Sequence, residues 1–289
     1  MSGWRARLRR GGGSGSDAGT GESEVGFDGQ IDRPPPPPAC PPGWRTGPPD
    51  FIGVGVQRGG TTRWCNLVIA HPEVVRVLAR KELHYFDRFY AGNCGESEIA
   101  GYHAYFPTDG RKTGEWTPYY MSAPWIPPLL IAAAPQARLL VLLRDPVERF
   151  LSGIELNAKV AQRRNVPLSR YAPLEAFSRG LYHAQLTNLM AYFDRSQILL
   201  LQYERCNREP ETQLRRTYEF LGFSDLDFLP NLDAHPREQP DKPALDRGSR
   251  AAYVQAYSAD VTALAHSFPE IDVGMWPNFA HLAERVDAA

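Results

Sequence analysis

The residues best suited to chemistry lie in a glycine-containing stretch, FIGVGVQRGGTT, at positions 51–62. An apolar run ends there in glycines and threonines. Glycines let a backbone approach a ligand closely, and the N–H groups at the start of a helix favour an anion. We therefore predict a phosphate-binding turn made of backbone N–H groups, two hydroxyls and one guanidinium; a plain strand-to-helix connection is the alternative. Its residues are Arg58, Gly59, Gly60, Thr61 and Thr62.

This turn differs from the nucleoside-triphosphate pattern G-x-x-x-x-G-K-[ST]. Counting from Gly55 puts Gly60 in the second glycine position, but Thr61 stands where the pattern requires lysine. The apolar run LLVLL at 139–143 is followed by Arg144 and not directly by the aspartate that would hold magnesium. A P-loop kinase is therefore the second choice among enzymes, and its need for ATP with magnesium would distinguish it.

A second group of polar residues follows that apolar run, in LLVLLRDPVERFLSG at 139–153. Arg144 stands at the end of the predicted strand, and Ser152 lies two turns into the helix predicted to follow it. Asp145 suits the cap of that helix, with Glu148 at capping-box spacing. Because the carboxyl ends of parallel strands line one crevice, this group should face the same ligand as the glycine turn and bind a second phosphate. The alternative is that Arg144 only pairs with Asp145 or Glu148.

Together the two motifs resemble the cofactor-binding motifs of sulfotransferases that use 3′-phosphoadenylyl sulfate (PAPS). In that family the glycine turn holds the 5′-phosphosulfate, and an arginine and a serine spaced like Arg144 and Ser152 hold the 3′-phosphate. Three further segments are similar to the heparan-sulfate-type branch (3-O- and N-sulfotransferases): RKELHYFD at 80–87, GEWTPYYM at 114–121 and RGLYHAQLTNLMAYFDRSQILLLQYE at 179–204. The resemblance covers about residues 51–222.

The resemblance implies in-line transfer of a sulfuryl group from PAPS to a hydroxyl or amine of a small-molecule or glycan acceptor. Glu82 falls at the position of the family's general base, with His84 in reserve, and Arg58 stands where a catalytic lysine is usual. Trp116 also replaces a usual lysine and is predicted either to line the acceptor site or to belong to the core. A sulfuryl group carries less charge than a phosphoryl group, so we predict no metal.

Several of these assignments have alternatives. Glu82 could pair with Lys81 or Arg80 at the surface. The segment DRGSR at 246–250 either closes over the 3′-phosphate or begins a helix. Outside the enzymes, the alternative is a non-catalytic nucleotide- or glycan-binding module that retains the crevice without turnover.

The elements that must position these residues follow from the apolar pattern. Predicted strands lie at 51–56, 139–143 and 198–201, and predicted helices lie at 62–70, 146–157, 180–193 and around 253–264. Strand–helix alternation of this kind predicts an α/β fold. We expect a P-loop-like three-layer sandwich with a central parallel sheet flanked by helices.

Composition and charge limit the remaining possibilities. The chain has 289 residues, 43% of them hydrophobic, and a net charge of −1, so no global field attracts nucleic acid. Residues 1–50, with GGGSG at 11–15 and five prolines at 34–38, are predicted to be a disordered Gly/Pro-rich tail. The sulfotransferase domain is then expected at 51–289.

Several features bear on the compartment. No apolar run of about 18 residues is present, so we predict no membrane span. Neither the membrane anchor nor the C-terminal cysteine pair of eukaryotic Golgi relatives is visible in the sequence. These features predict a soluble, cytoplasmic, bacterial member of the family, and they leave the oligomeric state open.

Overall fold

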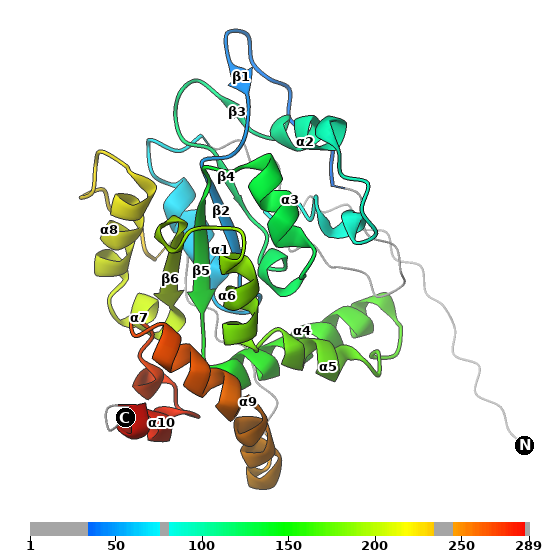
Figure 1. Ribbon diagram of the computed structural model, residues 1–289, viewed down its shortest axis with the longest axis vertical. Helices are drawn as coiled ribbons and strands as arrows, with labels where there is room; N and C mark the ends of the chain where they lie inside the picture. Colours follow the sequence, from blue (N-terminus) through cyan, green and yellow to red (C-terminus); the bar gives the residue numbers. More distant parts are fainter. Residues whose placement is uncertain (1–33, 76–80, 234–244, 287–289) are drawn as a thin grey trace, which may run out of the picture.

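The computed structural model describes residues 34–75, 81–233 and 245–286 (Figure 1). Within these ranges the centre is a four-stranded sheet in the order β4–β2–β5–β6, and every strand pair in it is parallel. The strands are β2 (Phe51–Gly55), β4 (Gly114–Trp116), β5 (Arg138–Leu143) and β6 (Ile198–Gln202). The carboxyl ends of the two middle strands, β2 and β5, therefore lie side by side.

Alternate residues of the strands enter two separate apolar cores, because successive side chains of a strand point to opposite faces of the sheet. Ile52, Leu139 and Leu200 belong to one core, whereas Phe51 and Leu140 belong to the other. The first core also takes residues from α2 (Glu96–His103), α3 (Ile126–Ala133), α4 (Pro146–Arg164), α5 (Ala172–Ser178), α6 (Tyr182–Met190), α9 (Arg247–Ser267) and α10 (Ala280–Val286). The second takes residues from α1 (Thr61–Ile69), α7 (Tyr203–Arg208) and α8 (Pro210–Leu221).

The predicted fold class is confirmed: a parallel sheet lies between two layers of helices. The three predicted strands are present as β2, β5 and β6, each within one residue of its expected bounds. The predicted helix at 146–157 is longer and runs to Arg164, and the C-terminal helix is α9, a helix of 21 residues. Four short 3₁₀ helices complete the described part: η1 (Asp87–Phe89), η2 (Tyr120–Ser122), η3 (Arg195–Gln197) and η4 (Val273–Met275).

Part of the segment before residue 51 contacts the domain. Strand β1 (Arg45–Thr46) pairs in antiparallel fashion with β3 (Pro107–Thr108). The hydroxyl group of Tyr105 donates to the carbonyl of Pro35. Residues just before the predicted domain boundary at position 50 therefore already pack on the domain. The rest of the predicted tail, residues 1–33, lies outside the described part.

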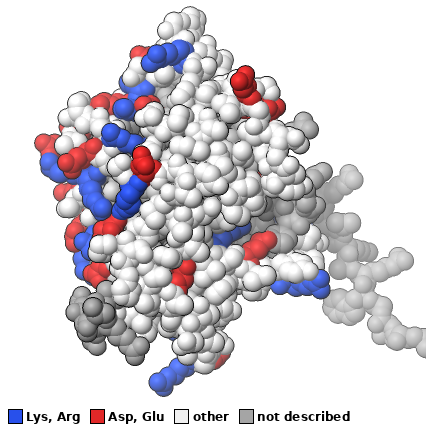
Figure 2. Space-filling view, in the orientation of Figure 1, with Lys and Arg blue, Asp and Glu red and all other residues white. Residues whose placement is uncertain are grey.

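The surface shows how charge is distributed. In Figure 2, Lys, Arg, Asp and Glu side chains gather together along the side that carries α8, while the face over α6 is largely uncharged. Opposite charges are interspersed there, so the view shows no broad field of one sign over the described residues. None of the described helices combines the length and the apolar character needed to cross a membrane.

The contact between β2 and β4 gives a direct test of the packing. A Cβ atom added to Gly53 would lie 2.0 Å from Cδ2 of Trp116. We expect Gly53→Ala to lower the free energy of unfolding by about 1–3 kcal/mol, measured by urea denaturation, because the core has no room for the methyl group. In Gly47→Ala, the control, the added Cβ meets nothing within 4 Å, and the change should stay below about 1 kcal/mol. Equal effects at the two positions would contradict this packing.

Candidate active site

The glycine turn between β2 and α1 is tightly enclosed. A Cβ atom on Gly59 would lie 2.5 Å from the carbonyl oxygen of Leu142, and one on Gly60 would lie 2.6 Å from the ring of Tyr203. Gly60 also has φ 85°, in the left-handed region, and helix α1 begins directly after it at Thr61. Both glycines are therefore required by close approach to β5 and α7.

The structure corrects one of the expected donors. The N–H group of Gly59 donates to the carbonyl of Val56 at 3.0 Å, so it closes the turn and does not point at a ligand. The start of α1, with Gly60, Thr61 and Thr62, remains as the expected anion-binding element. No acidic side chain lies in the first turn of α1, so nothing there opposes an anion.

The two basic groups predicted from the sequence lie together. Nε of Arg58 donates to Oγ of Ser152 at 2.9 Å, and Nη1 of Arg144 donates to the carbonyl oxygen of Arg58 at 3.0 Å. The Arg144 guanidinium also lies over the Tyr203 ring, 4.6 Å from its centroid. The carboxyl ends of β2 and β5 thus bring Arg58, Arg144 and Ser152 to one place.

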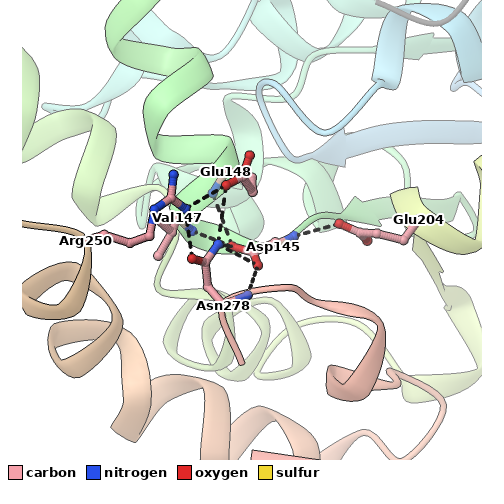
Figure 3. A network of polar contacts seen from close by, with 6 residues as sticks. All are labelled: Asp145, Val147, Glu148, Glu204, Arg250 and Asn278. Carbon is pink, nitrogen blue, oxygen red and sulfur yellow. Dashed lines mark hydrogen bonds and ion pairs between the residues drawn. The ribbon is translucent and has the colours of Figure 1, made fainter. Parts of the chain in front are cut away.

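At the start of α4, one of the two predicted capping contacts is present. Oδ1 of Asp145 accepts from the N–H groups of Val147 at 2.9 Å and Glu148 at 3.1 Å, so the predicted cap is confirmed. The predicted capping box is wrong, because the N–H of Asp145 donates to Glu204 at 3.1 Å instead of to Glu148 (Figure 3). Glu148 accepts from Arg250 at 2.9 Å. The alternative, in which Arg144 pairs with Asp145 or Glu148, is therefore not what the structure shows, because Arg144 contacts the Arg58 carbonyl and the Tyr203 ring.

The DRGSR segment begins a helix. Asp246 is the N-cap of α9, and its side chain accepts from the N–H of Ser249 at 2.9 Å. Arg250 extends from the first turns of this helix to Glu148 and Asn278 (Figure 3). The segment therefore joins α9 to the start of α4.

Glu82 lies in a cluster of groups of alternating charge. Nζ of Lys81 lies 2.5 Å from Oε1 of Glu82, and Nε2 of His84 lies 3.6 Å from Oε2 of Glu82. Nδ1 of His84 lies 2.7 Å from Oδ2 of Asp87. The Lys81 and Glu82 side chains are only 14% and 11% exposed, so their ion pair lies mostly inside the protein and not at the surface. Arg80, the other partner considered, lies outside the described residues.

These contacts fix the protonation of the cluster. Burial alone would raise the pKa of Glu82, but the charge of Lys81, a hydrogen bond from Lys81 and the charge of His84 lower it to about 2. Burial alone would lower the pKa of His84, but the hydrogen bond to Asp87 and the charges of Asp87 and Glu82 raise it to about 9. At neutral pH Glu82 is therefore a carboxylate and His84 an imidazolium. Because an imidazolium cannot accept a proton, His84 is unsuitable as the reserve base.

Trp116 belongs to the core. Its side chain is fully buried, lies against Gly53 and joins the core that holds Phe51 and Trp64. The prediction that its ring lines an acceptor site is therefore wrong, because the ring has no surface to offer a ligand. Its backbone still serves the site, since the Trp116 carbonyl accepts from the N–H of Glu82 at 3.1 Å.

Arg179 connects the glycine turn with the cluster around Glu82, and the sequence did not single it out. Its guanidinium donates to Oε1 of Gln57 and lies 5.5 Å from the centroid of the Tyr119 ring. The ring of Tyr119 lies 6.1 Å from that of His84. Contacts between side chains thus run from Gln57, next to Arg58, to the histidine beside Glu82. The two partners of Arg179 come from separate segments of the chain, so its position in the sequence gave no signal.

Comparison with known proteins identifies the family. The sequence profile described as "Sulfotransferase domain" matches residues 48–229. Because the match covers more than half of the chain, the protein belongs to the sulfotransferase family.

Individual relatives agree with the branch suggested by the motifs. Heparan sulfate glucosamine 3-O-sulfotransferase 3A1 of Mus musculus is 31% identical over 192 residues, and the match covers 62% of this chain and 47% of that protein. Heparan sulfate glucosamine 3-O-sulfotransferase 6 of Homo sapiens is 32% identical over 199 residues, and the match covers 64% of this chain and 55% of that protein. The chain spans about half the length of these relatives. The predicted resemblance to the heparan-sulfate-type branch is confirmed.

Solved structures support the fold. The crystal structure of a sulfotransferase from Alicyclobacillus acidocaldarius has a TM-score of 0.63 at 21% identity and covers 79% of this chain and 98% of that one. Sulfotransferase STF9 from Mycobacterium avium has a TM-score of 0.53 at 14% identity, with 79% and 78% covered. At these identities the similarity shows a shared P-loop-like fold.

The pKa of His84 gives a prediction for stability. Its pKa rises from 6.5 to about 9 on folding, so its contribution is complete below pH 6.5 and is lost as the pH rises through about 9. We expect the free energy of unfolding of the wild type, minus that of His84→Gln, to fall across this interval. Chemical denaturation at a series of pH values measures the difference. A difference that stays constant would contradict the contacts assigned to His84.

Proposed function

We propose that the protein is a sulfotransferase that moves a sulfuryl group from PAPS to a carbohydrate hydroxyl group. The observation that carries the proposal is the meeting of Arg58, Arg144 and Ser152 at the ends of β2 and β5, next to the start of α1. The relatives named as heparan sulfate 3-O-sulfotransferases support a glycan acceptor. A small-molecule acceptor, an amine acceptor and a cytoplasmic location remain predictions from the sequence.

The donor groups fit a nucleotide with two separate phosphate groups. The start of α1, with Gly60, Thr61 and Thr62, would hold the 5′-phosphosulfate, since helix N-termini favour anions. Arg144 and Ser152 would hold the 3′-phosphate. A guanidinium carries five N–H donors and the bond to Arg58 uses one. Ser152 is fully buried and its oxygen accepts from Arg58, so its O–H group would be left to donate to the phosphate.

The remaining residues suit the transfer step. When bound, PAPS supplies the sulfuryl group and leaves as adenosine 3′,5′-bisphosphate. The Arg58 guanidinium would stabilise the negative charge that builds on the departing phosphate oxygen. Arginine keeps the charge of the usual lysine, but its donors are arranged in a planar fork and it cannot lose its proton.

Glu82 would accept the proton of the acceptor hydroxyl. Its contacts keep it in the carboxylate form, which is the form that can take a proton. A carboxyl group with a pKa of about 2 is a weak base. The proton therefore moves late, when the acceptor oxygen has become acidic by bonding to sulfur. His84 and Lys81 would then hold Glu82 in place through the contacts that they already make.

Glu82→Gln tests the catalytic role and separates an enzyme from a binding module. We expect the rate of sulfate transfer from labelled PAPS to fall by at least about 100-fold, the usual scale of general base catalysis. Binding of adenosine 3′,5′-bisphosphate, measured by calorimetry, should change by less than about threefold, because Glu82 is not assigned to the nucleotide.

The matched control is Glu96→Gln, at an exposed glutamate that begins α2, and it should leave both quantities unchanged. A wild type without turnover on any acceptor would favour the binding module. A full rate in Glu82→Gln would remove Glu82 from the mechanism. Binding of ATP with magnesium in preference to the bisphosphate would favour the kinase.

Arg144→Ala tests the second phosphate site. The substitution should weaken the binding of adenosine 3′,5′-bisphosphate by about 1.5–3 kcal/mol, the scale of a charge-assisted hydrogen bond. It should weaken the binding of adenosine 5′-phosphosulfate, which lacks the 3′-phosphate, much less. The control is Arg138→Ala, which removes an arginine from the opposite end of the same strand and should affect neither ligand. Equal losses for the two nucleotides would show that Arg144 does not bind the 3′-phosphate.

A further inference from the structure

The peptide group between Arg144 and Asp145 is held from two sides. The hydroxyl of Tyr182 donates to the Arg144 carbonyl at 2.8 Å. The Asp145 N–H donates to Oε1 of Glu204 at 3.1 Å. Tyr182 belongs to α6 and Glu204 to α7, so two helices fix the backbone from which the Arg144 side chain extends.

The segment just before α10 completes this arrangement. Nε1 of Trp276 donates to Oε2 of Glu204 at 3.1 Å. The backbone N–H of Asn278 donates to Oδ2 of Asp145, and its side-chain Nδ2 lies 3.0 Å from both carboxylate oxygens of Asp145 (Figure 3). Two side chains of this segment thus hold the carboxylate of Asp145, the residue after Arg144, and the carboxylate of Glu204, which accepts from the Asp145 N–H.

The same segment is anchored to the next strand. Nε2 of Gln202, at the end of β6, donates to the Asp272 carbonyl at 2.8 Å, and the Asp272 N–H donates back to Oε1 of Gln202 at 3.2 Å. Asn278 is also fixed, because its Oδ1 accepts from Arg250 at 2.9 Å. Figure 1 shows α9 and α10 at the end of the sheet where α4 begins. The segment is therefore braced against the start of α4, the end of β6 and α9.

Burial gives these contacts their weight. Asp145 and Trp276 are fully buried. A buried carboxylate oxygen that loses its donor has no water to replace it. The carboxylate must then move to find another donor, or the folded state is destabilised by about 1–3 kcal/mol. Movement of Asp145 would change the direction of Arg144. A small displacement of this kind is enough to weaken a site whose donors must match a phosphate.

We propose that residues 272–279, which we call the C-terminal clamp, set the direction of the Arg144 side chain and so the selectivity of the site for a 3′-phosphate. Asn278 and Trp276 are positioning residues, because they act through Asp145 and Glu204 and not on the ligand. The inference rests on the proposed function, since it takes Arg144 as the ligand of the 3′-phosphate.

The test compares two nucleotides that differ only in that phosphate. The measured quantity is the ratio of the Kd of adenosine 5′-monophosphate to the Kd of adenosine 3′,5′-bisphosphate, determined by calorimetry on the full chain. We expect Asn278→Ala and Trp276→Phe each to lower this ratio about fivefold, the effect of one lost hydrogen bond. Asn278→Asp keeps the size of the side chain but sets a second carboxylate against Asp145, so the loss should exceed about tenfold.

A control separates this role from a general loss of stability. Leu282→Ala removes buried apolar contact from α10 without touching Asp145 or Glu204. It should lower the melting temperature and leave the ratio within about twofold of the wild type. If Asn278→Ala does not fold, Trp276→Phe, which keeps most of the ring, gives the same comparison.

The outcomes separate the clamp from the proposed function. A wild type that does not prefer the bisphosphate contradicts the proposed function itself. A wild type that prefers it, with clamp variants that keep the wild-type ratio, overturns the clamp alone. Loss of the ratio in Leu282→Ala to the same extent as in Asn278→Ala also overturns it, because general loosening would then explain both.

Discussion

Two arginine side chains of like charge meet at the carboxyl ends of β2 and β5, and the rest of the site depends on holding them together. The guanidinium of Arg144 is fixed by the Arg58 carbonyl and the Tyr203 ring, and the guanidinium of Arg58 by the hydroxyl of Ser152. A carbonyl and an aromatic face orient the Arg144 guanidinium without cancelling its charge. The arrangement therefore favours a ligand that brings its own negative charges.

The backbone is strained at three of the candidate site residues. Arg58, Glu82 and His84 have φ of 66°, 67° and 51°, in the left-handed region that side chains with a Cβ avoid. Each such residue costs about 1–2 kcal/mol. Strained backbone of this kind is maintained by surrounding contacts and is common at functional sites. For Glu82 the contacts are the Trp116 carbonyl on its N–H and the charges of Lys81 and His84 on its carboxylate.

The sequence predicted the features that depend on neighbours in the chain. Continuous apolar runs identified β5 and β6, and the order of Asp, Pro and Glu after Arg144 located the start of α4. The meeting of the two basic groups was expected from a general property of parallel sheets, and the structure brings Arg58 and Ser152 together as that property requires.

Features that depend on distant contacts were not predictable in this way. The Glu204 carboxylate takes the place of Glu148 at the Asp145 N–H, although it lies 59 positions away, and no local spacing marks it. Trp116 was ambiguous because an aromatic residue suits a core as well as a sugar site. The contact with Gly53 in the neighbouring strand decides it. The bonds from Asn278 to Asp145, 133 positions apart, likewise appear only when α9 and α10 are in place.

The central claim is that the two basic groups bind one doubly phosphorylated nucleotide. A crystal structure of the complex with adenosine 3′,5′-bisphosphate tests it most directly. The account predicts the 5′-phosphate at the N–H groups of Gly60, Thr61 and Thr62, and the 3′-phosphate on Arg144 and Ser152. A bisphosphate bound elsewhere, or with its 3′-phosphate directed away from Arg144, would contradict it.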